Sequence, residues 1–257
     1  MQSDEQPIYD PNSLAHAESR AAWPPKLSRL LLAAVLTAGL GYIVLKTLVS
    51  IFAVPVDIAT FPEQSPVWLY ERLDKVQSEV DAKNFSIAFG AIGAIFGLSC
   101  VLFAFGARSV KAMAIALVAS AAMGVVGANL SNWMFTTMRL NSGKETLIVG
   151  IALDGMKQSI IGYSLLWGLI GLGVGLGIGS VGGFRKSLVA GVSGLLGGTL
   201  AAMMYVVLTA QFSIGTTMNE VIPNGDITQA IWLVLFTVVI AACIALGSGE
   251  KRRKEAV

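Results

Sequence analysis

The chain has 257 residues, of which 54% are hydrophobic and only 13% are charged, and its mean hydropathy is +0.70. Soluble domains carry about 25% charged residues, so the composition excludes a soluble globule as well as a disordered or disulfide-rich secreted chain. The net charge of +2 is too small to indicate a nucleic-acid partner. We therefore expect an integral membrane protein whose main partner is the lipid bilayer.

Six segments are long and apolar enough to cross a membrane as helices. A spanning helix needs about 20 apolar residues, and the 24 residues between Lys83 and Arg108 are one such uncharged window. Transmembrane β-strands would be about ten residues long with alternating polarity, and these windows are more than twice that length. The predicted fold is an all-α polytopic membrane protein with spans at about 30–51, 85–106, 111–134, 159–180, 187–210 and 228–247.

Three parts follow from these spans: a six-helix domain at 30–247 and a tail on each side. Residues 1–29 show no apolar period and are expected to be a largely disordered tail, whereas residues 248–257 form a short basic tail. Six spans place both tails on one side of the membrane. That side carries 11 lysine and arginine residues against 6 on the other, so both termini are expected in the cytoplasm of a plasma or inner-membrane protein.

The first loop on the opposite side predicts an amphipathic helix over residues 66–82. Ser65 and Pro66 are typical of a helix start. An apolar face then repeats at helical spacing; its residues are Leu69, Leu73, Val76 and Val80. Such a helix either lies against the outer membrane face or docks a partner.

Two further loops on that side carry local signals. The uncharged run 146–153 is too short to span a bilayer and is expected to cap the bundle or to dip into it as a re-entrant segment. Before the last span, Asp226 is a candidate N-cap, with Gln229 three residues later as in a capping box.

Small residues recur at three- and four-residue steps along the predicted spans. This spacing lets helix backbones approach closely, and van der Waals contact then drives association in lipid. Either tight packing or a glycine-lined path would use such faces. The predicted helix-packing residues are Gly93, Gly97, Gly124, Gly171, Gly175, Gly179, Gly191, Gly194 and Gly198.

A shift of 74 residues aligns the second and third spans with the fourth and fifth without a gap. Gly97 then falls on Gly171 and Gly124 on Gly198, among eight identities in about 45 positions. Because each unit holds two helices, both copies would have the same orientation. The pattern predicts a parallel tandem repeat of helix pairs.

Residues that carry chemistry are scarce. The single histidine, His16, lies in the N-terminal tail, and no aspartate or glutamate lies inside a predicted span. Metal sites, catalytic triads and proton relays depend on such residues. We therefore expect no enzymatic activity, no metal and no cofactor.

A few polar and aromatic side chains in the spans remain to be placed. Asn129 and Ser164 are a candidate polar site, with hydrogen bonding between helices as the simpler interpretation. An outer aromatic belt is expected from four residues: Trp68, Trp133, Trp232 and Tyr205. Asn84-Phe85-Ser86 and Asn129-Leu130-Ser131 match the glycosylation pattern, but at membrane depth we expect them to be chance matches.

The function predicted from these features is structural. The bundle would associate with itself or with membrane partners through its small-residue faces and the 66–82 helix. The alternative is a transporter or channel for a small neutral solute, built from the tandem repeat.

Overall fold

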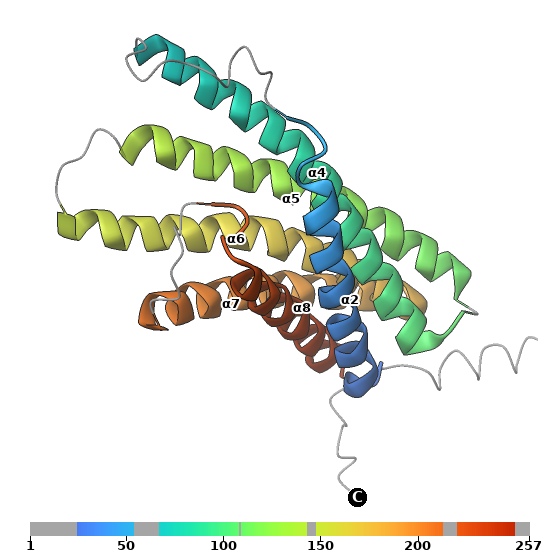
Figure 1. Cartoon of the computed structure of the whole chain (residues 1–257). Helices are drawn as coiled ribbons and strands as arrows, with labels where there is room; N and C mark the ends of the chain where they lie inside the picture. The colour runs from blue at the N-terminus through green and yellow to red at the C-terminus, as the bar shows by residue number, and fades with distance from the viewer. Residues whose placement is uncertain (1–24, 54–66, 108, 143–147, 213–219, 250–257) are drawn as a thin grey trace, which may run out of the picture.

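The computed structural model describes residues 25–53, 67–107, 109–142, 148–212 and 220–249 (Figure 1). Within these residues all regular secondary structure is helical, and six helices are long and apolar enough to span a membrane. The predicted all-α fold with six spans is confirmed. The elements are α2 (Leu27–Leu48), α4 (Val67–Phe105), α5 (Val110–Ser142), α6 (Ile148–Gly179), the short 3₁₀ helix η1 (Ser180–Gly182), α7 (Phe184–Phe212) and α8 (Asp226–Ser248).

Glycines form the two short turns at the end of the bundle where α2 begins. Gly106 follows α4 with φ 76°, and its N–H donates to the carbonyl of Leu102 at 2.8 Å. Gly183 follows η1 with φ 96° and precedes α7 directly. A positive φ is strained for other residues, so glycine lets the chain reverse within a few residues and start the next span.

The helices form a closed ring in chain order. Each packs against the next one, and α8 returns to pack against α2 (Figure 1). The fourth span, α6, is the most buried one and lies between α5 and α7, while also contacting α4 across the ring. The start of α2 and the end of α8 lie at the same end of the bundle (Figure 1).

Helix α4 is much longer than a bilayer requires. Its 39 residues measure about 58 Å at 1.5 Å per residue, against about 30 Å of hydrocarbon. The predicted 66–82 helix is therefore not a separate element: residues 67–82 are the first part of α4, which runs on into the span. No glycine or proline lies between residues 67 and 89 to end the helix.

The same continuity holds for α6. Residues 148–153, expected to cap the bundle or re-enter the membrane, are instead the first turns of α6. The predicted disordered and basic tails lie almost wholly outside the described residues.

Candidate functional site

The pairs α4–α5 and α6–α7 meet backbone to backbone at glycines. A Cβ atom on Gly171 would overlap the carbonyl group of Gly194, and one on Gly194 would overlap that of Gly171. Contacts this close supply van der Waals energy that lipid cannot. Other predicted packing glycines where a Cβ would overlap the facing helix are Gly93, Gly97, Gly124, Gly175, Gly179 and Gly198. Gly191 faces leucine side chains of α6 instead.

Helix α6 makes such contacts on two sides. Gly173 and Gly177 lie on the face opposite the α7 contact, where a Cβ atom would overlap Ser120 and Ala116 of α5. Alternate glycines from 171 to 179 therefore serve two neighbours. Since both faces are buried within one chain, a second copy of the chain cannot use them without displacing a helix.

The predicted tandem repeat stays a prediction. The glycine contacts allow the register of α4 against α5 to be compared with that of α6 against α7. In α4–α5, Gly97 faces Ala116 and Gly93 faces Ser120. A shift of 74 residues would place Gly171 against Ala190, yet Gly171 faces Gly194. The two pairs thus differ in register by four residues, which is about one helical turn.

A cluster of aromatic rings fills the centre of the bundle. Trp167 of α6 lies with its ring centroid 5.2 Å from Trp232 and 5.0 Å from Phe236, both on α8. Phe89 of α4, Tyr163 of α6 and Tyr205 of α7 belong to the same cluster. The expected outer belt is therefore wrong for Trp232 and Tyr205, which are 0% and 4% exposed and belong to the core. Trp133 is 64% exposed, as a belt residue must be.

Several polar atoms in this core have no conventional hydrogen-bond partner among the described residues. They are the indole nitrogens of Trp167 and Trp232, the hydroxyl of Tyr205 and the hydroxyls of Ser120, Ser131 and Ser164. Aromatic faces around the two indoles are weak acceptors. Tyr163 does have a partner, because its hydroxyl donates to the Glu220 carbonyl at 2.9 Å.

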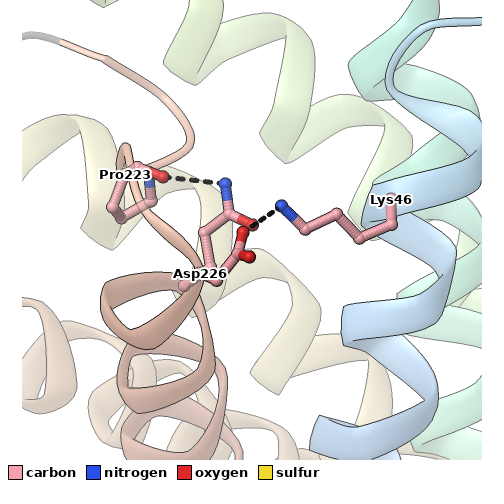
Figure 2. A network of polar contacts seen from close by, with 4 residues as sticks. Lys46, Pro223 and Asp226 are labelled. Atoms are coloured by element: carbon pink, nitrogen blue, oxygen red, sulfur yellow. Dashed lines mark hydrogen bonds and ion pairs between the residues drawn. The ribbon is translucent and has the colours of Figure 1, made fainter.

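The segment before α8 closes the bundle over the aromatic core. Val221 is 4% exposed, and the Gln229 amide donates to the Pro223 carbonyl at 2.9 Å. Figure 2 shows this bond beside an ion pair between Lys46 of α2 and Asp226 of α8. The predicted capping role of Asp226 is wrong: Gly225 is the N-cap, and Asp226 is the first helical residue. Sequence reasoning missed the pair because nothing in the local sequence indicates that α2 and α8 are neighbours.

The candidate polar residues Asn129 and Ser164 have separate surroundings. Asn129 is exposed on α5, and its amide donates to the Ser86 hydroxyl of α4 at 2.7 Å and to the Val125 carbonyl. The Ser164 hydroxyl is buried and without a partner. No described contact joins the two. Further out, Asn132 donates to the Ser78 carbonyl at 3.1 Å, so Asn129 and Asn132 both bind α4 rather than form a pocket with α6.

Asn84 holds the chain that follows α2. Its side chain is 2% exposed; the amide donates to the Phe52 carbonyl and the side-chain oxygen accepts from the Phe52 N–H, both at 2.9 Å. A buried side chain engaged twice is not available for glycosylation, as expected for a chance match to that pattern. At the other end of α2, the Arg29 guanidinium donates to the Ala104 carbonyl at 3.3 Å, which satisfies a free carbonyl in the last turn of α4.

Among the described residues, no group of histidine, cysteine, aspartate and glutamate side chains could hold a metal ion. The fold and these contacts define the chain as a multi-pass integral membrane protein. Comparison with models of known protein families, with curated proteins and with solved structures finds no match.

Proposed function

We propose that this membrane protein is a non-catalytic scaffold that assembles with a second copy or with a membrane partner. The observation that carries the proposal is the extension of α4 beyond the bilayer. Arg72 and Lys75 are exposed there on one face of the helix. A charged helical face outside the lipid is a surface that another protein can recognise through charge complementarity.

The inside of the bundle supports the same proposal. Aromatic rings fill its centre, and the glycine faces of α4 to α7 lie against their own neighbours. The association surface is therefore the extension of α4 rather than the small-residue faces. We also propose that both termini are cytoplasmic, on the strength of the lysine and arginine bias, which places this extension outside the cytoplasm.

The test is the size of the assembly in mild detergent. The full chain is solubilised from its own membranes, cross-linked and measured by mass. We expect a species heavier than the monomer, and we expect it to decrease when Arg72 and Lys75 are both changed to glutamate. The matched control is Lys111→Glu, an exposed charge at the opposite end of the bundle. A strictly monomeric chain with no associated protein would count against the proposal.

A transporter or channel for a small neutral solute is the second candidate. Its favouring observation is the set of buried hydroxyl and indole groups without conventional partners, because such groups can bind water or a polar solute. Solute uptake into liposomes carrying the purified chain discriminates the two: flux by a monomer supports transport, whereas an impermeable assembly supports the scaffold.

A further inference from the structure

An open groove lies on the surface of α4, between the chain that follows α2 and helix α5. We call it the outer groove. Its volume is about 600 Å³ and its lining is mostly apolar. It is lined by Phe52, Glu79, Ala82, Lys83, Ser86, Ile87 and Asn129.

The groove crosses the boundary between lipid and water. Lys83 is the last charged residue before 24 uncharged ones, which cover about 36 Å as a helix and so exceed the hydrocarbon core. Glu79 lies one turn, about 6 Å, further from the lipid, and Ile87 lies one turn deeper and is 42% exposed. Along the membrane normal the groove therefore presents a carboxylate, then an ammonium group, then apolar side chains.

The two charges at the mouth are free to meet a ligand. Glu79 and Lys83 are both exposed, and no ion pair joins them within the described part of the chain. The polar groups deeper in the groove are already engaged, since Ser86 accepts from Asn129 and donates to the Ala82 carbonyl at 2.6 Å. The deeper surface thus offers no free donor and suits hydrocarbon.

Phe52 is a fixed wall of the groove. It lies beyond the end of α2, where its backbone N–H donates to the side-chain oxygen of buried Asn84 and its carbonyl accepts from the Asn84 amide, so that its backbone is held against α4. The backbone of this wall is therefore positioned by contacts between the chain after α2 and α4.

We propose that the outer groove binds phosphatidylethanolamine from the surrounding bilayer. In this lipid the phosphate lies next to the glycerol and the primary amine lies further out, which matches the order of Lys83 and Glu79. An acyl chain would follow Ile87 and Phe52 into the bilayer. Phosphatidylglycerol offers no cation to Glu79, and the quaternary amine of phosphatidylcholine has no N–H to donate to it.

The test is lipid retention by the purified full chain, measured by native mass spectrometry with added dioleoyl phosphatidylethanolamine, -glycerol or -choline. We expect retention of phosphatidylethanolamine to exceed the other two by about threefold, in the range of an exposed ion pair. Glu79→Gln removes this preference, and Lys83→Gln weakens the binding of all three lipids. Lys111→Gln, an exposed charge at the opposite end of the bundle and outside the groove lining, leaves the preference intact.

Ile87→Trp fills the groove without changing its charges and is expected to lower retention of all three lipids. Equal retention of the three lipids by the unmodified chain would overturn the proposal. So would a Lys83→Gln variant that behaves like Lys111→Gln while its melting temperature is unchanged.

Discussion

The ammonium group of Lys46 lies 2.5 Å from a carboxylate oxygen of Asp226, although 180 residues separate them in the chain. The pair joins the last turn of α2 to the first residue of α8 at the point where the ring of helices closes. The position of Asp226 also stabilises its carboxylate, because the N-terminus of a helix carries a partial positive charge. Lys46 has a second neighbour, with its Nζ 5.4 Å from the centre of the Tyr42 ring.

We expect Lys46→Gln and Asp226→Asn each to lower the melting temperature of the detergent-solubilised chain slightly. Both side chains are well exposed, at 44% and 72%, so the effect is small and disappears at high salt. The exchange Lys46→Asp with Asp226→Lys does not restore the loss, because a lysine at the start of α8 opposes the helix dipole. Full recovery in the exchanged variant would contradict this account.

Gly194→Ala is expected to destabilise the bundle by about 1–3 kcal/mol, the usual cost of overpacking. The new methyl group would overlap the Gly171 carbonyl, and a backbone atom cannot move aside cheaply. Gly39→Ala is the matched control in an exposed part of α2, where nothing lies within 4 Å of the new atom. Unfolding in mixed micelles measures both, and equal effects would show that Gly194 is not a contact glycine.

The five tryptophans should differ in their contact with lipid. Brominated phospholipids quench indoles that face acyl chains, so Trp133→Phe is expected to reduce the quenchable fluorescence. Trp167→Phe removes a fully buried ring, so a larger fraction of the remaining tryptophan fluorescence should be quenched. A decrease in that fraction after Trp167→Phe would place this ring at the lipid surface, against the packing described above.

Asn84→Ala is expected to lower the free energy of unfolding by about 1–3 kcal/mol, because it removes two hydrogen bonds from a buried position. It also releases the chain around Phe52, which should exchange its amide hydrogens faster. Asn129→Ala serves as the comparison. Because that side chain is exposed, its removal should lower the free energy of unfolding by less. Unchanged hydrogen exchange at Phe52 would show that Asn84 does not hold this segment.

Cysteine labelling tests the orientation. Phe184 is the first residue of α7 and is 81% exposed, and Asn224 is exposed at the opposite end of the bundle. With both termini cytoplasmic, an impermeant thiol reagent added to intact cells modifies Asn224→Cys at once and modifies Phe184→Cys only after permeabilisation. The reverse pattern would invert the topology.

The spans could be predicted from sequence because lipid imposes a length on every uncharged helix. The spacing of charges such as Lys83 and Arg108 therefore locates a span to within a few residues. The helix ends were less predictable. Hydropathy marks where a helix leaves the bilayer but says nothing about where the helix ends. Both α4 and α6 continue beyond the lipid.

The lateral arrangement could not be predicted. In a membrane the lipid-facing surface is as apolar as the core, so hydrophobicity does not distinguish Trp133, at the surface, from Trp232, in the centre. Glycine spacing is more informative, because backbone contact needs a bare face. Even so, Gly39 has nothing near it and shows that a glycine in a span is not always a contact.

The closure of the ring by α2 and α8 imposes an order on biogenesis. Among the described spans, α2 is synthesised first and has α8, the last, as a neighbour, and Gly41 of α2 lies between Ile92 of α4 and Leu233 of α8. The α4–α5 and α6–α7 hairpins can form as soon as each is inserted. Until α8 is inserted, however, one flank of α2 faces lipid or the insertion machinery, and the ring of described spans is completed only when α8 leaves the translocon.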